Sequence, residues 1–315
     1  MKFDPHTHST ASDGTMSPAV LMRHAADMRR RSLSRSSDDI GGIGLTDHDT
    51  VAGWAEAEAA VHTTGIALVR GMEVSCMLQD PGVTPERLAV QTHAVDGVDG
   101  HDDQRIPIHM LIYLADPTSD ALARHMRRAR SAREQRIEAM VRRLSERFPL
   151  TMDDVAAVTP AGAIAGRPHL ADALIRLGIV KTRAEAFARF LSPGSPYYVE
   201  LYSPDAYDVV EWARQAGGQA VWAHPRAVSR SRVASFEAIE SLADHGLFGV
   251  EVNHRDNPPA DQVKLHLLAR RLGLAEFGSS DFHGAGKPNA LGENVTDQSV
   301  IQELEHRSTL EVIVP

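Results

Sequence analysis

Three side chains near the start of the chain, His6, His8 and Asp13, have the types and the spacing of metal ligands. Two imidazoles at i and i+2 that follow an apolar start suggest a strand ending in a loop, because alternate strand residues point to one face and both rings could reach one cation. One such pair is weak evidence for a metal site. Its weight depends on whether further candidate ligands lie at comparable places along the chain.

Further candidates do lie at comparable places. Each follows a short apolar run that is typical of a strand, and together they are His48, Glu73, His109, His224, Asp281 and His283. Ligands that arrive from the ends of many strands are what a barrel active site requires. Mixed imidazole and carboxylate ligands suit Zn, Mn or Fe, whereas Ca and Mg prefer oxygen ligands. The sequence therefore predicts a centre of divalent metal ions, with Zn, Mn and Fe left open.

Strand and helix patterns alternate along the chain. Seven strands are expected, at 2–4, 42–46, 66–75, 108–114, 219–223, 248–253 and 274–280. Helices are expected between several of them, at 17–30, 50–63, 205–216, 235–245 and 259–272. This alternation predicts an α/β protein with parallel strands and crossover helices, and seven units fit a closed or distorted barrel better than a doubly wound sheet.

Three segments interrupt the alternation. Residues 31–40 are rich in Ser, Arg and Asp and are expected to form a surface loop, and residues 79–107 are expected to form an extended loop near the mouth of the site. Residues 116–202 carry several helical patterns and no strand pattern. We therefore expect a barrel domain made of 1–115 and 203–315, interrupted by a helical insert at 116–202.

Composition limits the classes of protein. A chain of 315 residues with 43% hydrophobic residues can bury a sizeable core, and no apolar run reaches the roughly 18 residues that span a bilayer. The sequence does not open on a basic and then apolar leader, and the single cysteine, Cys76, cannot form an internal disulfide, so we expect a cytoplasmic protein. The net charge of −9 argues against a stable complex with duplex nucleic acid, although a local cationic site could still bind a small anion.

Several other polar residues have simpler interpretations. The arginines between Arg124 and Arg147 alternate with apolar residues at nearly helical spacing, which favours a solvated helix face. Asp47 and Asp49, beside His48, could form caps and turns or orient that ligand. The remaining histidines are expected at the surface: His24, His62, His93, His101, His125, His245, His266 and His306.

These residues together resemble the polymerase and histidinol phosphatase (PHP) family of metal-dependent phosphoesterases. The matching segments follow the family's order over nearly the whole chain: His6-Thr7-His8, Ser12-Asp13-Gly14, Leu45-Thr46-Asp47-His48-Asp49-Thr50, Gly71-Met72-Glu73-Val74-Ser75, His109, Ala223-His224-Pro225 and Ser280-Asp281-Phe282-His283. The resemblance implies a distorted (β/α)7 barrel with two to three divalent metal ions. The first ion would be held by His6, His8, Glu73 and Asp281, the second by Asp13, His48 and His283, and the third by bridging Glu73, His109 and His224.

The segment Gly166-Arg167-Pro168-His169, within the expected insert, is similar to a G-R-P-H segment in the subgroup that acts on nucleotides and short oligonucleotides. Arg167 could instead be a surface ion-pair partner and Pro168 merely the first residue of a helix. We favour phosphate binding because a guanidinium offers a bidentate fork for phosphate and His169 stands two residues away. His254, at the end of another expected strand, is a candidate for protonating the leaving oxygen.

The resulting hypothesis is a hydrolase in which a metal-bridging hydroxide attacks phosphorus while Arg167 and His169 hold the non-bridging oxygens. The expected substrates are nucleoside 5′-phosphates and 3′,5′-bisphosphates and the 5′ ends of short RNA. One alternative is a histidinol-phosphate-type phosphatase. Another is a metal-dependent amidohydrolase, which also opens on H-x-H but would be expected to carry a bridging lysine at a strand end.

Overall fold

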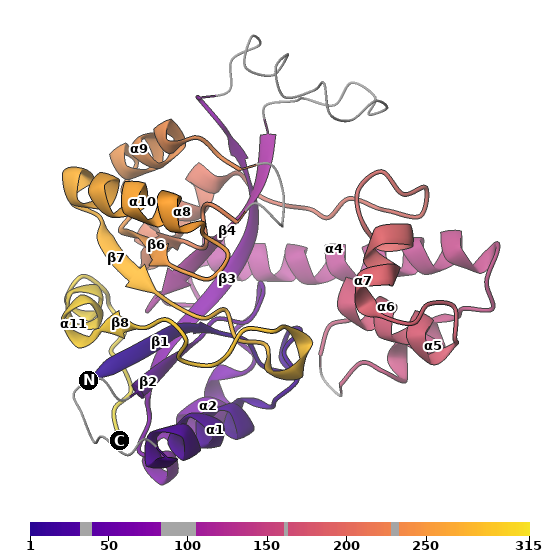
Figure 1. Ribbon diagram of the computed structural model, residues 1–315, viewed down its shortest axis with the longest axis horizontal. Coiled ribbons are helices and arrows are strands. Elements are labelled where there is room, and N and C mark those ends of the chain that lie inside the picture. Colours follow the sequence, from indigo (N-terminus) through magenta and orange to yellow (C-terminus); the bar gives the residue numbers. More distant parts are fainter. Residues whose placement is uncertain (32–39, 83–104, 161–162, 228–232) are drawn as a thin grey trace.

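Eight strands form the centre of the molecule. The computed structural model describes residues 1–31, 40–82, 105–160, 163–227 and 233–315 (Figure 1). The strands are β1 (Lys2–Thr7), β2 (Ile40–Leu45), β3 (Ala67–Gln79), β4 (Arg105–Tyr113), β5 (Gln219–Trp222), β6 (Gly249–Asn253), β7 (Ala275–Gly278) and β8 (Thr296–Asp297). The loops expected at 31–40 and 79–107 lie largely outside the described residues.

The strands lie in one sheet, in the order β7-β6-β5-β4-β3-β2-β1-β8. The sheet curls until its two ends meet, because the Gly278 amide donates to Thr296 Oγ1 at 2.9 Å and that hydroxyl donates to the Gly278 carbonyl at 2.8 Å. Glycine permits the close approach of β1 and β2, since a Cβ at Gly44 would lie 1.9 Å from the Pro5 carbonyl oxygen. The expectation of a distorted α/β barrel is confirmed, and the barrel is nearly closed.

The expectation that all strands are parallel is wrong. β4 runs antiparallel to both β3 and β5, and β8 runs antiparallel to β1. The long strand β3 pairs with β4 from Gly71–Tyr113 through to Gln79–Arg105, so these two strands form a hairpin arm rather than a βαβ unit. The two-residue strand β8 is too short to show a periodic pattern, which explains why only seven strands were expected.

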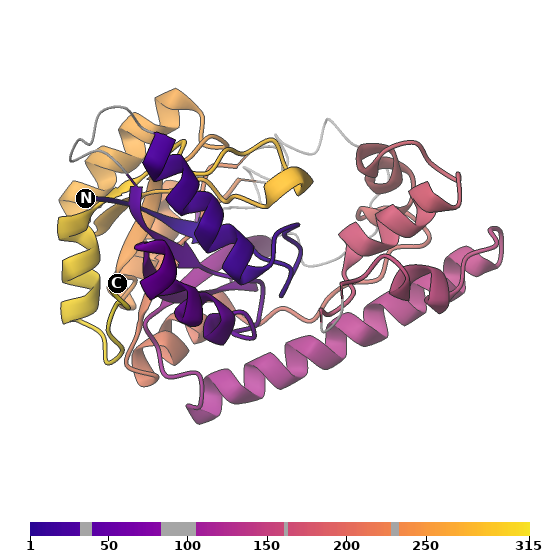
Figure 2. The ribbon, with the colours of Figure 1, turned by 90° about the horizontal axis from the view of Figure 1, so that it is seen from below.

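Helices cover the outside of the barrel (Figures 1 and 2). They are α1 (Pro18–Arg31), α2 (Trp54–Thr64), α8 (Ala206–Gln215), α9 (Phe236–Asp244), α10 (Pro259–Leu272) and α11 (Gln298–His306). Side-chain caps begin two of them, because Asp205 accepts from the Tyr207 amide and Ser235 accepts from the Ala238 amide. Five of these helices were expected; α11 was not. No helix in the described part of the chain is both long enough and apolar enough to cross a membrane.

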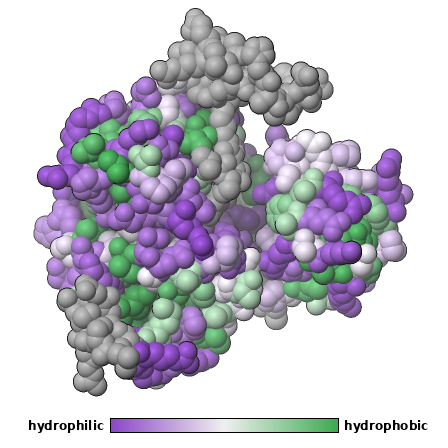
Figure 3. Space-filling model, viewed as in Figure 1, coloured by the Kyte–Doolittle hydropathy of each residue, from purple (hydrophilic) through white to green (hydrophobic). Residues whose placement is uncertain are grey.

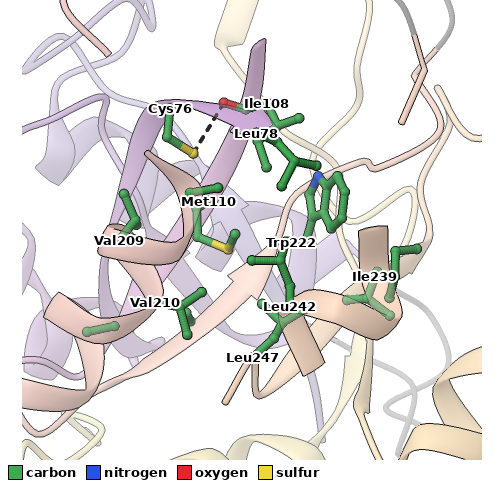
Figure 4. Packing of buried hydrophobic residues seen from close by; sticks show 14 of the residues in the cluster. Cys76, Leu78, Ile108, Met110, Val209, Val210, Trp222, Ile239, Leu242 and Leu247 are labelled. Atoms are coloured by element: carbon green, nitrogen blue, oxygen red, sulfur yellow. Dashed lines mark hydrogen bonds between the residues drawn. The ribbon is translucent and has the colours of Figure 1, made fainter. Parts of the chain in front are cut away.

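The largest hydrophobic cluster lies between β3, β4 and β5 on one side and α8 and α9 on the other (Figure 4). Met110 and Trp222 from the strands pack with Val210 and Leu242 from the helices. Cys76 lies in this cluster, where its thiol contacts the Ile108 carbonyl oxygen at 3.7 Å and burial raises its pKa. Cys76 therefore serves as a small apolar core residue, as the sequence indicated.

Residues between β4 and α8 form helices that project from the barrel (Figure 2). They are α4 (Asp120–Ser145), α5 (Met152–Ala156), α6 (Arg167–Arg176), α7 (Arg183–Ala186) and the π-helical turn η2 (Phe187–Leu191). A separate cluster of apolar residues, including Met140, Leu174 and Phe190, holds them together. α4 extends from the barrel to the other projecting helices, so side chains along it can contact both parts of the molecule (Figure 2).

Candidate metal centre

All nine predicted metal ligands lie at the same end of the barrel. His6 and Glu73 belong to β1 and β3, and His109 belongs to β4; the others lie in the loops that follow β1, β2, β5 and β7. The structure brings their nitrogen and oxygen atoms into three groups, within each of which the atoms lie no more than 4.8 Å apart. The groups are His6, His8, Glu73 and Asp281; His8, Asp13, His48 and His283; and His48, Glu73 and His109.

Two of these groups contain the expected sets of ligands, and the third differs because it contains His48 and lacks His224. The first group has the expected members, and the second has the expected members with His8 added. His224 lies beside the third group, since its Nε2 is 3.3 Å from Glu73 Oε1. Glu73 belongs to two of the groups, as His8 and His48 also do, and it is the shared carboxylate; it lies 2.6 Å from His109 Nδ1 and 3.0 Å from His8 Nε2.

The donor atoms of the centre fit divalent cations. Four of them are buried without a hydrogen-bond partner among the described residues: His48 Nδ1, His109 Nδ1, His283 Nε2 and Glu73 Oε2. Buried polar atoms are normally hydrogen-bonded, so atoms left over beside one another need another partner. Imidazole nitrogens together with carboxylate oxygens are the ligands that Zn, Mn and Fe take in proteins.

The electrostatics of Glu73 and His48 point the same way, whereas the pKa of His8 is raised to about 9, because the effect of burial, which lowers it, is outweighed by neighbouring Asp281 and Glu73. Burial would raise the pKa of the Glu73 carboxyl, but the surrounding His109, His48 and His6 hold it well below its usual value, so the carboxylate is ionised. Burial lowers the pKa of His48 to about 3, against the opposing effect of Glu73 and Asp13. Ionised carboxylates and a neutral imidazole are the protonation states that bind metal.

Buried carboxylates outside the ligand set orient the rings. Glu251, in the middle of β6, accepts from His6 Nδ1 at 2.8 Å and from the His224 amide at 2.7 Å. This contact leaves His6 Nε2 directed at the centre, as is usual for an imidazole ligand with a carboxylate behind it. Sequence reasoning missed this role of Glu251; the available signal was a carboxylate in the middle of an apolar strand.

Asp47 fixes the loop that carries Asp13. Its carboxylate accepts from the Ser9 amide at 2.8 Å, the Ser9 hydroxyl at 2.7 Å and the Ser12 hydroxyl at 2.6 Å. Ser12 Oγ lies 3.4 Å from His8 Nδ1, so this network also reaches a candidate ligand. Of the two interpretations left open for Asp47, orientation of the site describes its contacts better than a simple cap does.

Asp49 links His48 to α4. It is buried, and its carboxylate accepts from His125 Nε2 at 3.0 Å and from the Arg133 guanidinium. The expectation that His125 lies at the surface is wrong, because the first part of α4 packs against the barrel and leaves this residue 3% exposed. The arginine face of α4 is likewise not wholly solvated, since Arg133 points inward to Asp49.

Unusual backbone angles accompany the site. Three of the four described non-glycine residues with positive φ are Asp49 at 53°, His224 at 32° and Asp281 at 54°. Such angles are unfavourable for residues with a Cβ and persist where the surrounding structure imposes them, often at functional sites. The surrounding structure therefore holds His224 and Asp281 at the metal centre and Asp49 against α4. Lys287, which sequence reasoning also missed, donates to Asp281 Oδ2 at 2.9 Å.

The three other predicted site residues lie in different surroundings. Arg167, the first residue of α6, donates from Nη1 to the Leu191 carbonyl at 3.0 Å and is partly buried. His169 is buried, and its Nδ1 accepts from the Gly166 amide at 3.0 Å. Burial lowers the pKa of His169, against the opposing effect of Asp13. His254 is buried, with its ring centroid 5.3 Å from that of His224.

Comparison with known proteins defines the class. The chain is 30% identical to a 3′,5′-nucleoside bisphosphate phosphatase of Chromobacterium violaceum, over 90% of this chain and 88% of that protein. It is 26% identical to the 5′-3′ exoribonuclease Rnm of Escherichia coli, over 89% of this chain and 85% of that protein. A crystal structure of a predicted metal-dependent phosphoesterase from Bifidobacterium adolescentis is similar, with 36% identity, a TM-score of 0.81 and coverage of 98% of this chain and 96% of that one.

No protein-family model matches the sequence. The relatives nevertheless share most of their length with this chain, and their similarity extends over both the barrel and the projecting helices. The protein is a metal-dependent phosphoric ester hydrolase, and it belongs to the PHP-like metal-dependent phosphoesterases.

Replacing the shared carboxylate tests the centre. Glu73→Gln keeps the shape of the side chain but removes the charge that would hold neighbouring cations, so we expect metal to be lost and turnover to fall at least about 100-fold, while the barrel still folds. Metal content, melting temperature and turnover are measured on the variant and the parent. Unchanged metal content and turnover would show that Glu73 does not bridge.

Replacing Asp49 tests the link to α4. Asp49→Asn tolerates the positive φ but loses the charge that Arg133 and His125 contact, so we expect the affinity for metal to fall about 10–100-fold. Metal titration by calorimetry gives the affinity, and the exposed Asp153→Asn is the matched control. Equal affinities in the parent and both variants would limit Asp49 to a structural role.

Proposed function

We propose that this protein hydrolyses phosphate esters of nucleotides: nucleoside 5′-phosphates, nucleoside 3′,5′-bisphosphates and the 5′ ends of short RNA. The observation that carries the proposal is the gathering of eight imidazole and carboxylate side chains into three overlapping groups, two of which contain Glu73, with His224 beside them. The relatives named for nucleoside bisphosphates and for RNA support the choice of substrate. Free nucleotides and short single strands are small enough to be held by one site, and we propose no stable complex with duplex nucleic acid.

We further propose two to three divalent ions of Mn, Zn or Fe, held by His6, His8, Asp13, His48, Glu73, His109, His224, Asp281 and His283. When bound, they would neutralise the charge of the phosphate and lower the pKa of a coordinated water. Residues 1–115 and 203–315 would form the catalytic barrel, and the helical insert at 116–202 would bind the substrate. We also propose a cytoplasmic location, where such substrates occur.

Three side chains outside the ligand set would act on the substrate. Two would bind phosphate, and the third would donate a proton. Arg167 and His169 would hold phosphate oxygens, through a guanidinium fork and an imidazole at the same end of α6. His254 Nδ1 accepts from the Asp256 amide at 3.1 Å, which favours the tautomer with a proton on Nε2. A proton held at this nitrogen, beside His224, can pass to the leaving oxygen.

The proposal predicts a dependence on charge. Arg167→Ala and His169→Ala should each lower kcat/KM for a nucleoside 3′,5′-bisphosphate about tenfold or more, because a charge-assisted contact with phosphate contributes roughly 1.5–3 kcal/mol. Metal content should not change, since neither residue belongs to the ligand set. Steady-state kinetics and metal analysis on the same samples check both statements.

The control is a neutral amide or lactone substrate. Phosphate hydrolysis that needs Arg167, without hydrolysis of the neutral substrate, supports the proposal. Hydrolysis of the neutral substrate that is indifferent to Arg167→Ala would assign the protein to amidohydrolase chemistry instead. Loss of metal from Arg167→Ala would mean that this arginine maintains the structure.

A further inference from the structure

Three arginines gather where the insert faces the barrel. Arg133 and Arg136 lie one turn apart on α4, and Arg167 begins α6. Arg136 and Arg167 contact the same ring, with their guanidinium carbons 5.0 Å and 5.8 Å from the centroid of Tyr198. Figure 3 shows the molecule hollowed between the barrel and the insert, and α4 passes behind this hollow.

Positive charge in this arginine cluster exceeds negative charge. Among the described residues, Arg133 is the one member with an ion pair, and its partner is Asp49. Arg167 donates to the carbonyl oxygen of Leu191 and Arg136 to that of Val199, and Arg136 is also hydrogen-bonded to the side chain of Tyr198. Neutral carbonyl groups do not balance two guanidinium charges, so the cluster lacks at least one counter-charge.

Arg136 is the clearest case of a positive charge without a counter-charge. Its side chain is nearly buried, and the whole residue is 8% exposed. Its Nη2 is buried and has no hydrogen-bond partner among the described residues. Burial and the neighbouring Arg167 lower the pKa of Arg136 to about 10, so it remains cationic at neutral pH. A buried donor and a buried charge without partners are both costly, which indicates that a ligand completes this place.

The cluster is connected to the metal centre. Arg133 contacts Asp49, which directly follows His48 in the chain, and His48 Nδ1 lies 3.3 Å from Glu73 Oε2. An anion at the cluster would therefore sit beside the metal centre without occupying it. Guanidinium groups that lack an anionic partner suit a phosphoryl group, which accepts several charge-assisted hydrogen bonds.

We propose that Arg136 and Arg167, with Arg133 beside them, bind a second phosphoryl group of the substrate, one that is not hydrolysed. The inference rests on the proposed function and refines it: the preferred substrate carries two phosphoryl groups, one at the metal centre and one at the arginine cluster. It assigns Arg167 to the second phosphoryl group and leaves His169 to the first. A substrate with one phosphoryl group would leave the cluster uncompensated and would bind more weakly.

Arg136→Met tests the inference. We expect the ratio of kcat/KM for a nucleoside 3′,5′-bisphosphate to kcat/KM for a nucleoside 5′-monophosphate to fall at least tenfold, mainly through KM for the bisphosphate. The control is Arg143→Met, because Arg143 is exposed on the same helix and donates to the carbonyls of Pro196 and Tyr198 in the segment that Arg136 also contacts. A purely structural role for Arg136 would lower kcat/KM for both nucleotides alike and leave their ratio unchanged.

A second measurement does not depend on turnover. Inorganic phosphate should raise the Tm of the parent and of Arg143→Met more than the Tm of Arg136→Met, because an anion bound only to the folded state stabilises it. Arg136→Lys, which keeps the charge but loses the fork, covers the case in which Arg136→Met does not fold, and it should show a smaller defect in the same direction.

The outcomes separate the two proposals. If the parent hydrolyses both nucleotides and Arg136→Met changes both equally or neither, the second site is wrong and the proposed function stands. If no nucleotide is hydrolysed, the proposed function is wrong, and the Tm series decides the anion site alone. Equal phosphate-induced shifts in all variants would overturn the site in either case.

Discussion

The buried carboxylate of Glu73 is the constraint on which the rest of the structure depends. It is completely buried, and nitrogens of His8, His48, His109 and His224 surround it at 2.6–3.3 Å. Buried polar groups normally have partners, and the donor atoms of this centre that lack a hydrogen-bond partner among the described residues are those that metal ions would bind. β3 holds Glu73 in place, because β2 and β4 hold that strand on both sides. The barrel therefore holds the donor atoms of the metal centre close together despite the free-energy cost of their desolvation.

Buried contacts of the metal centre continue into the helical insert. Asp49 follows a candidate ligand, adopts a positive φ and contacts two side chains of α4. The metal centre and the proposed substrate-binding helices are thus joined through one buried carboxylate, without a flexible connection at that point. This arrangement explains how an insert with its own hydrophobic cluster can present arginines at a defined position beside the barrel.

The sequence predicted the parts of the site that depend on local pattern. His6, His8 and Glu73 could be placed because strand ends are marked by apolar runs followed by polar residues. It did not predict that β4 is antiparallel, because an apolar strand reads alike in both directions. Nor did it predict the inward positions of His125 and Arg136, since helical spacing defines a face but not the neighbour that the face meets. Glu251 escaped notice because only tertiary contacts show which ring a buried carboxylate orients.

The central claim is that Glu73 is shared between neighbouring metal ions. Anomalous diffraction from crystals of the purified protein, recorded at the absorption edges of Mn, Fe and Zn, tests it most directly. The account predicts at least two peaks per chain, with the two oxygens of Glu73 each within bonding distance of a peak and imidazoles of the nine-residue set completing the coordination. A single peak, or peaks that Glu73 does not touch, would contradict it.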